Sequence, residues 1–434
     1  MIRACIYTLG CRVNQYESDA IMQELKSLGV EIVSPTQECD ICIINTCTVT
    51  GESDRKSKQI IRRLIKKNPD SVIVVTGCYS QINPADAEKI PGVDFVCGNN
   101  GKSVIAKKSL ELLSKKRGKC EIFMPDIYNG CFDALWVGAP LMRTRAFIKI
   151  QDGCNSKCAY CIIPYARGSV RSNSAQCILA EASNIVNEGC QEIVLTGIET
   201  ASYGKDFKNG YSLADLLEEV NKIEGLRRIR LGSLDPSSIT KELVDKMVSL
   251  DKVMPHFHIS MQSGCTKTLN EMRRKYNIDM AREGLNLLRG AFPALMLSAD
   301  VITGFPNESE EDFNQTLEFF KEERFLHLHI FPYSKREGTP ASIMENQVPE
   351  HIKKERLHRL EALQKDIKLE LLNSFISSTP SVEVLFETFD GEYICGHTPN
   401  FIEVRVKSSV PRGNELLKVK PTHTDGDYVY GDLI

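Results

Sequence analysis

Long apolar runs are absent from this sequence of 434 residues. No stretch of about 18 or more consecutive apolar residues occurs, which argues against an ordinary transmembrane helix. The first ten residues, MIRACIYTLG, have neither the basic region nor the apolar core of a secretion signal and are instead typical of a β-strand. We therefore expect a cytoplasmic protein that has no membrane contact.

A strong charge of either sign is also absent, since the formal net charge is −3. The charges are unevenly distributed along the chain. Residues 55–67 carry seven positive and no negative charges, and residues 107–119 carry six positive charges against one glutamate. Such runs often form solvated helix faces, but two of them in one region favour a polyanionic partner.

Internal repeats and low-complexity tracts are absent, whereas cysteine is abundant, with sixteen residues. In a long chain without an export signal, this number favours metal or redox chemistry over disulfide bonds. Not every cysteine needs a function. Cys5, Cys42 and Cys177 lie within apolar patterns, and we expect them to be small buried hydrophobic residues.

The first region, residues 1–117, alternates apolar strand-like runs with helical patterns. This alternation is typical of a parallel sheet with helices on its faces, so we predict an α/β domain here. A linker over residues 118–143 is expected to follow. The strand candidates are residues 4–10, 39–46, 71–77 and 93–98, and helical patterns cover residues 20–29 and 58–68.

The second region, residues 144–376, contains six further strand candidates separated by amphipathic helical segments. Six β/α units in series predict an open, partial (β/α)6 barrel whose site lies at the carboxyl ends of the strands. This region ends with one long helix over residues 351–376. Residues 377–434 contain short strands and turn residues, which predicts a small all-β barrel. The six strand candidates are residues 146–153, 192–199, 228–234, 256–262, 295–304 and 327–334.

Cys154, Cys158 and Cys161 follow the first of these six strands with C-x3-C-x2-C spacing, and no fourth cysteine or histidine occurs in the next fifteen residues. Three thiolates on a short loop can hold three irons of a cubane cluster and leave the fourth iron open for a ligand. The alternative is a zinc site that a distant residue completes, such as His256 or His258.

Cys11, Cys47 and Cys78 form a second set, because each follows a predicted strand of the first region. The carboxyl ends of parallel strands meet at one edge of a sheet, so we expect the three thiols to converge there. Again there are three thiolates, and hence another cluster with one open iron. The alternative is that three cysteines fall at these positions by chance in a cysteine-rich chain.

The C-x3-C-x2-C spacing, with Tyr160 before the last cysteine, resembles the radical S-adenosylmethionine (SAM) superfamily. The segments TLGCRVNQYES (8–18), NTCTVTGESDRKSKQIIRR (45–63) and FPYSKREGTPA (331–341) resemble the methylthiotransferases. These segments most resemble the sequences of the MtaB branch, which modifies N6-threonylcarbamoyladenosine at position 37, in the anticodon loop of tRNA. The resemblance covers nearly the whole chain and implies that the terminal β-unit is a TRAM domain.

The resemblance implies two 4Fe-4S clusters and two SAM molecules as cofactors. One SAM methylates a sulfur ligand on the cluster of the first domain. The second SAM, on the Cys154/Cys158/Cys161 cluster, yields a 5′-deoxyadenosyl radical that abstracts hydrogen from adenine C2, where the methylthio group is transferred. Such a C–H bond is beyond side-chain acid–base catalysis, so the cofactors carry this step. An electron donor protein is also implied.

Further cofactor contacts are expected from Tyr160, Glu199, Ser233, Gln262 and Arg274. Gly197-Ile198-Glu199 occupies the place of the superfamily's Gly-Gly-Glu strand end, which receives the SAM amine, although the second glycine is missing. Ser233 and Gln262 lie at strand ends, where each contacts SAM or the base or simply lines the barrel. Arg274 is expected to pair either with the SAM carboxylate or with an acidic neighbour on its helix.

The terminal β-unit interleaves basic and aromatic side chains, a combination that suits contact with RNA backbone and bases. An ordinary solvated barrel is the alternative. Two rival functions stay open: the same chemistry on isopentenyladenosine or on a ribosomal protein aspartate, and a non-catalytic metal-cluster protein that binds RNA. The residues concerned are Lys407, Arg412, Lys418, Lys420, Phe401, Tyr428 and Tyr430.

Overall fold

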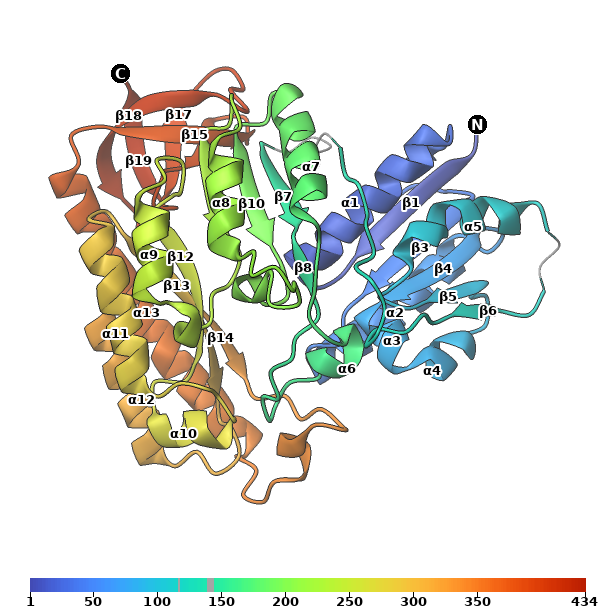
Figure 1. Cartoon of the computed structure of the whole chain (residues 1–434), viewed down its shortest axis with the longest axis horizontal. Coiled ribbons are helices and arrows are strands. Elements are labelled where there is room, and N and C mark those ends of the chain that lie inside the picture. Colours follow the sequence, from blue (N-terminus) through green and yellow to red (C-terminus); the bar gives the residue numbers. More distant parts are fainter. Residues whose placement is uncertain (116–117, 139–143) are drawn as a thin grey trace.

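The computed structural model describes residues 1–115, 118–138 and 144–434. Two α/β units lie side by side, and a small β-barrel packs on one end of the second unit (Figure 1). The predicted fold class is therefore confirmed. Part of the predicted linker, residues 139–143, lies outside the described residues. None of the described helices is long and apolar enough to span a lipid bilayer.

The first unit is a six-stranded parallel sheet with the order β2-β1-β3-β4-β5-β6. All four predicted strands are present. The two strands that the sequence pattern missed are very short edge strands, and β6 lies within the predicted linker, so we propose that the first domain extends to residue 123. The strands are β1 (Arg3–Thr8), β2 (Glu31–Ile32), β3 (Ile41–Thr46), β4 (Val72–Gly77), β5 (Phe95–Cys97) and β6 (Glu121–Phe123).

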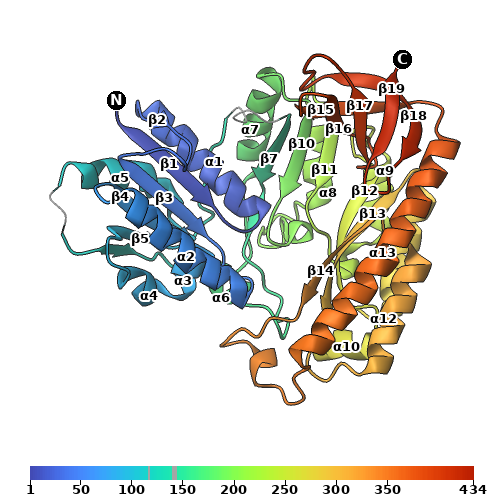
Figure 2. The same cartoon turned by 180° about the vertical axis from the view of Figure 1, so that it is seen from behind.

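Helices cover both faces of this sheet, because its central strands are apolar on both sides. Helices α1 (Arg12–Ser27) and α5 (Ile105–Leu113) pack on one face. Helices α2 (Gly51–Lys67), α3 (Cys78–Ile82) and α4 (Pro84–Glu88) pack on the other face, which is the near face in Figure 2. Each of α1, α2 and α3 begins just beyond a strand's carboxyl end, which places the helix starts at one edge.

The second unit contains the six predicted parallel strands in two three-stranded sheets, β11-β10-β7 and β12-β13-β14. Single bridges, Ile229–Val253 and Leu234–Ile259, connect the two sheets. The six strands are β7 (Arg145–Lys149), β10 (Glu192–Thr196), β11 (Arg228–Leu231), β12 (His256–Gln262), β13 (Met296–Thr303) and β14 (His327–Pro332), and a ribbon of β8 (Gln151–Asp152) and β9 (Arg171–Ser172) follows β7.

Amphipathic helices cover the outside of this partial barrel and share one apolar core with its strands. The helix α6 (Ile163–Arg167) is different, since it lies between the two units. The helices are α7 (Ala175–Asn187), α8 (Leu213–Asn221), α9 (Lys241–Val248), α10 (Thr266–Glu271), α11 (Ile278–Ala291), α12 (Glu310–Glu323) and the long α13 (Glu350–Ser378). Short 3-10 turns occur in this unit at η2 (Thr200–Ser202), η3 (Pro236–Ser238) and η4 (Pro340–Ile343), and in the first unit at η1 (Lys102–Val104), directly before α5.

The carboxyl-terminal unit is a closed barrel that packs against the amino-terminal ends of the second unit's strands. Arg228 donates to the backbone oxygens of His397 and Glu383, and Arg230 donates to those of Thr398 and Pro399. The strands are β15 (Val382–Phe389), β16 (Tyr393–His397), β17 (Glu403–Lys407), β18 (Leu416–Thr424) and β19 (Val429–Leu433).

Phe401, which the sequence suggested as an RNA contact, belongs instead to this interface. Its ring stacks on His256 at 4.6 Å and on His397 at 4.5 Å, between ring centroids. The guanidinium groups of Arg145 and Arg230 lie 5.0 and 4.8 Å from its centroid. Phe401 therefore closes the amino-terminal end of the partial barrel, away from the strand ends where the site is expected.

Candidate active site

The Cys154–Cys161 loop begins where the β8–β9 ribbon turns away from the barrel. Gly153 has a φ of +73°, and a Cβ there would lie 1.9 Å from the backbone oxygen of Ser169, so no other residue fits. The backbone N–H of Cys154 donates to the oxygen of Gly168 at 3.0 Å. These contacts fix the loop at the carboxyl end of the strands.

Glu199 lies beside the first cysteine of this loop. The Sγ of Cys154 is 3.2 Å from Oε2 of Glu199, and the backbone N–H of Glu199 donates to Oε1 of Gln151 at 2.9 Å. Burial, together with the charge of Glu199, raises the pKa of Cys154 to about 12. A metal that takes the thiolate would reverse this preference, and the Glu199 carboxylate would then be free to bind a cationic group.

Arg274 lies beside the second cysteine. Its Nη1 is 3.3 Å from Sγ of Cys158 and 3.4 Å from the hydroxyl of Tyr160, and its Nη2 donates to Oδ2 of Asp235 at 2.5 Å. The acidic partner is thus on the loop after β11 and not on a neighbouring helix turn, as one alternative expected. Arg274 supplies a positive charge next to the cysteine loop, where a carboxylate ligand would be stabilised.

Ser233 and Gln262 occupy the strand ends at which they were predicted. Ser233 is half-buried just after β11, and Gln262 is the last residue of β12, where the register with β13 shifts. Gln262 has a φ of +64°, an uncommon conformation for a residue with a side chain. Such strain is often found at functional strand ends, so Gln262 stays a candidate for contact with ligand.

For the alternative of a zinc site at this loop, neither His256 nor His258 is available as the fourth ligand. Both ring nitrogens of His258 are engaged, by Oγ of Ser298 at 2.9 Å and by Asp300 at 3.2 Å. His256 stacks on Phe401 at the opposite end of the barrel strands. In the described parts of the chain, neither predicted cysteine set has its three sulfurs within 4.8 Å of one another, whereas a single ion needs them that close.

Cys11, Cys47 and Cys78 lie together at the carboxyl edge of the first sheet, after the adjacent strands β1, β3 and β4. Cys11 is the residue before α1, and Cys78 is the first residue of α3. The thiols interact electrostatically with one another, and burial raises the pKa of Cys47. Each thiolate of a cubane binds a different iron, so this wider spacing suits a cluster better than a single ion.

Glycines and asparagines hold these three strand ends close together. Gly77 has a φ of +98°, and a Cβ there would lie 2.4 Å from the backbone oxygen of Thr46. The side chain of Asn14 donates to the oxygens of Leu9 and Thr46 at 2.7 and 2.9 Å. These bonds join the residues before Cys11 and Cys47, so the edge is fixed without any ligand.

The two cysteine sets belong to neighbouring elements. Helix α6, which begins two residues after Cys161, packs against α3, which begins with Cys78. The side chain of Asn99 donates both to Sγ of Cys78 at 3.4 Å and to the oxygen of Ala166 at 2.8 Å. The structure therefore brings the six predicted cluster ligands to one region between the two α/β units.

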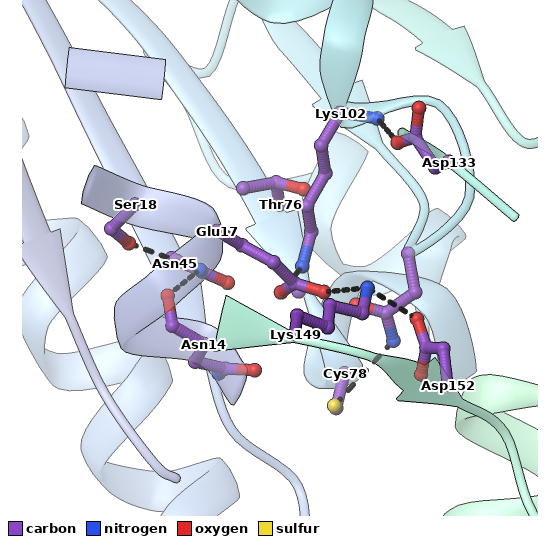
Figure 3. A network of polar contacts seen from close by, with 12 residues as sticks. Asn14, Glu17, Ser18, Asn45, Thr76, Cys78, Lys102, Asp133, Lys149 and Asp152 are labelled. Carbon is purple, nitrogen blue, oxygen red and sulfur yellow. Dashed lines mark hydrogen bonds and ion pairs between the residues drawn. The ribbon is translucent and has the colours of Figure 1, made fainter. Parts of the chain in front are cut away.

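A buried network of charges fills the contact between the units, and the sequence analysis missed it. Glu17 of α1 lies between Lys102 and Lys149 (Figure 3). Arg167 of α6 bonds both to Glu17 and to Asp152. Burial alone would raise the pKa of Glu17, but the three cations outweigh it and hold this pKa well below its ordinary value. Lys149 within the apolar strand AFIKI was the one visible signal.

A second contact between the units comes from the loop after β14. Arg336 donates to Oγ1 of Thr48 at 2.7 Å and to Oδ2 of Asp54 at 2.8 Å, and Ser334 accepts from the N–H of Gly51 at 2.9 Å. This loop therefore covers the residues that follow Cys47 and helps to enclose the region around it.

The cysteines expected to be plain hydrophobic residues do not all behave alike. Cys5 and Cys42 are fully buried, as predicted. Cys177 is exposed, so that prediction was wrong: it lies in the first turn of α7, where the helix face points to solvent.

Comparisons with known proteins agree with this architecture. Residues 3–98 match the uncharacterized protein family UPF0004, and residues 148–320 match the radical SAM superfamily. The threonylcarbamoyladenosine tRNA methylthiotransferase MtaB of Bacillus subtilis (strain 168) is 42% identical over 100% of this chain and 97% of its own length. The corresponding protein of Aquifex aeolicus is 41% identical over 83% of this chain and 88% of its own.

The chain belongs to the radical SAM methylthiotransferase family. It is a radical SAM enzyme, and SAM and 4Fe-4S clusters are its cofactors. A tRNA-2-methylthio-N(6)-dimethylallyladenosine synthase of Alkaliphilus oremlandii is 36% identical over 88% of this chain and 81% of its own length. The relatives thus include enzymes named for threonylcarbamoyladenosine and enzymes named for dimethylallyladenosine.

A solved structure supports the fold. The radical SAM methyltransferase TsrM of Kitasatospora setae, with cobalamin and a 4Fe-4S cluster bound, superposes with a TM-score of 0.57 at 15% identity. The alignment covers 79% of this chain and 77% of that one. At this identity the likeness concerns the fold alone, and it extends across both α/β units.

Proposed function

We propose that this enzyme adds a methylthio group to C2 of N6-threonylcarbamoyladenosine at position 37 of tRNA, with two 4Fe-4S clusters and two SAM molecules. The observation that carries the proposal is the meeting of two three-cysteine sets at neighbouring strand edges. Cys154, Cys158 and Cys161 would hold one cluster, and Cys11, Cys47 and Cys78 the other. When bound, these groups supply one-electron cleavage of SAM and a sulfur to transfer.

The chain's own residues would bind and orient the reactants. Glu199, whose backbone N–H donates to Gln151, would accept hydrogen bonds from the SAM amine. Arg274 would pair with the SAM carboxylate, and its hydrogen bond to Asp235 would orient the guanidinium for this contact. Tyr160, Ser233 and Gln262 would line the remaining wall. Holding cofactor and base in line in this way is the protein's contribution to the rate.

Two surfaces are candidates for the tRNA. Helix α2 exposes six basic side chains, and Arg55 among them forms an ion pair with Glu52. The six are Arg55, Lys56, Arg62, Arg63, Lys66 and Lys67. The second basic run extends over residues 116–117, which lie outside the described part of the chain. A positively charged helix face of this kind suits the phosphate backbone of RNA.

The terminal barrel offers the second surface. The guanidinium of Arg405 lies 3.7 Å from the ring centroid of Tyr428, and His423 stacks on Tyr430 at 4.8 Å. Lys418 and Lys420 are exposed on β18, whereas Lys407 pairs with Glu392 at 3.5 Å and Arg412 pairs with Glu415 at 3.1 Å. Half-buried tyrosines beside exposed cationic groups together suit stacking on unpaired bases of the anticodon loop.

The substrate is tested in cells. A bacterial strain that lacks its own MtaB enzyme is transformed with this gene, and the tRNA nucleosides are analysed by mass spectrometry. We expect the methylthio form of threonylcarbamoyladenosine to return. If a methylthio isopentenyladenosine derivative rises instead in a strain that lacks that modification, the substrate is the one named for the Alkaliphilus relative.

Iron content and SAM cleavage distinguish the proposed enzyme from a non-catalytic, metal-cluster RNA-binding protein. After anaerobic reconstitution we expect about eight irons per chain, because each open cubane carries four. The Cys154→Ala, Cys158→Ala, Cys161→Ala variant should keep about half of them. Bound zinc, or no 5′-deoxyadenosine from SAM and a reductant, would favour the non-catalytic alternative. We expect an electron donor protein as a further partner.

A further inference from the structure

A third group of cysteines lies at the opposite end of the first sheet. Cys5 of β1 and Cys42 of β3 are in register on neighbouring strands, and Cys39 precedes β3. The Sγ of Cys5 is 3.5 Å from that of Cys42 and 3.4 Å from that of Cys39. All three sulfurs lie within 4.8 Å of one another.

This trithiol group, Cys5/Cys39/Cys42, is separate from the predicted cluster ligands. Cys42 lies near the start of β3 and Cys47 directly follows its last residue, five residues later, which is about 16 Å at the rise of a parallel strand. The three thiols lie under α2, in the apolar core that contains Leu64. Cys5 and Cys42 have no exposed surface and Cys39 is 8% exposed.

The spacing of the trithiol group suits one metal ion. Metal–sulfur bonds of about 2.3 Å place three thiolates about 3.8–4.0 Å apart, so the two measured pairs need to open by a few tenths of an ångström. A disulfide would instead need a bond of about 2.05 Å and would leave one thiol over. The remaining buried cysteines do not share this arrangement: Cys97, for example, has its sulfur near the backbone oxygen of Gly101.

We propose that Cys5, Cys39 and Cys42 form a binding site for one divalent, thiophilic ion of the zinc group, held by three thiolates. Binding of M²⁺ to three thiols forms three metal–sulfur bonds and releases three protons, which leaves one net negative charge. The ammonium of Lys67, bonded to the oxygen of Pro35 at 3.2 Å, lies close enough to interact electrostatically with Cys5. It is placed to offset that charge. Soft thiolates select such ions over hard ones.

The backbone around the trithiol group is already fixed. Ser71 donates to the oxygen of Cys39, and the N–H of Cys39 donates to Oδ1 of Asn68 at 3.3 Å. Asn68 is the residue that directly follows α2. The turn that presents Cys39 is therefore held by α2 and by the start of β4, so the three sulfurs meet without a metal and an ion would enter a prepared site.

Cadmium is the probe for this proposal. Full-length, anaerobically reconstituted protein is equilibrated with Cd²⁺ and passed through a desalting column, and cadmium and iron are counted together by mass spectrometry. We expect one Cd²⁺ per chain with iron unchanged. Cys39→Ala should weaken binding at least tenfold, and Cys97→Ala, a buried thiol on the same sheet, should bind as the wild type does.

X-ray absorption at the cadmium edge of the wild-type protein tests the site without any variant, and it should give a shell of three sulfurs. The proposal is overturned if the protein retains no cadmium, if Cys39→Ala retains as much as the wild type, or if each cadmium gained is matched by iron lost. It is equally overturned if thiol counting finds two of the three cysteines joined as a disulfide in the anaerobic protein.

Discussion

Arg167 and Glu17 form an ion pair between the two α/β units, with Nη1 of Arg167 2.6 Å from Oε1 of Glu17 and neither side chain exposed. Arg167 comes six residues after Cys161, and Glu17 comes six residues after Cys11. The pair therefore connects the segments that carry the two predicted cluster sites. Because Glu17 lies on α1, which directly follows Cys11, and Arg167 lies on α6, which begins two residues after Cys161, a shift in the pair would alter the distance between these sites.

Glu17→Gln removes the carboxylate that Lys102, Lys149 and Arg167 share. Lys102, Lys149 and Arg167 would then face each other with only Asp152 to offset them. Losing one partner of a buried ion pair costs about 3–5 kcal/mol, and we expect a drop of that size in the free energy of unfolding, measured by anaerobic denaturant titration.

The matched control for Glu17 is Glu52→Gln, which removes an exposed, solvent-screened pair with Arg55 and should leave the free energy of unfolding nearly unchanged. Equal effects of the two substitutions would show that the buried network does not hold the units together.

Asn99→Ala removes the N–H that donates to Sγ of Cys78. Hydrogen bonds to cluster sulfurs raise the reduction potential, so the potential of the Cys11/Cys47/Cys78 cluster should fall while that of the other cluster stays the same. Redox titration followed by electron paramagnetic resonance checks this. Asn100→Ala, whose side chain bonds only to the oxygen of Asp126, should leave both potentials unchanged.

Glu199→Gln tests the SAM-binding role of this strand end. A hydrogen bond to a charged group is worth about 1.5–3 kcal/mol, so we expect the KM for SAM to rise about 10- to 100-fold. The measurement is 5′-deoxyadenosine formation at varied SAM concentration. An unchanged KM, equal to that of the exposed control Glu224→Gln, would remove Glu199 from the site.

Glu181 makes the stability of the contact between the two α/β units depend on pH. It accepts hydrogen bonds from the N–H of Val137 at 2.9 Å and from the hydroxyl of Tyr16, and burial raises its pKa to about 7. Between an unfolded pKa of about 4.5 and the folded value, the folded protein holds a proton that the unfolded chain releases. The contribution of Glu181 to stability therefore falls as the pH rises from 4.5 to 7.

Glu181→Gln should remove this dependence. The variant should match the wild type near pH 4.5 and exceed its stability by up to about 3 kcal/mol above pH 7, from denaturant midpoints at several pH values. Glu188→Gln, on the exposed end of the same helix, is the control. A constant difference across the pH range would contradict the raised pKa of Glu181.

The sequence predicted the strands that carry the site because their apolar residues are either nearly continuous, as in β3 and β4, or alternate with polar ones, as in β12. Cys11, Cys47 and Cys78 could be placed at one edge from topology alone, since parallel strands share their direction. Glu17 could not be assigned a role, because its partners come from residues 102, 149 and 167 and only the folded contact brings them together. The prediction that Phe401 contacts RNA was wrong for the same reason. An aromatic residue in a small barrel indicates RNA contact or packing equally well until its neighbours are known.

The most direct test of the two-site account uses purified enzyme, SAM, a reductant and tRNA that carries threonylcarbamoyladenosine, with 5′-deoxyadenosine and the methylthio nucleoside quantified by mass spectrometry. The Cys154→Ala, Cys158→Ala, Cys161→Ala variant should form neither product. The Cys11→Ala, Cys47→Ala, Cys78→Ala variant should still form 5′-deoxyadenosine but no methylthio nucleoside. Methylthio product from the second variant, or 5′-deoxyadenosine from the first, would contradict the division of tasks between the two cysteine sets.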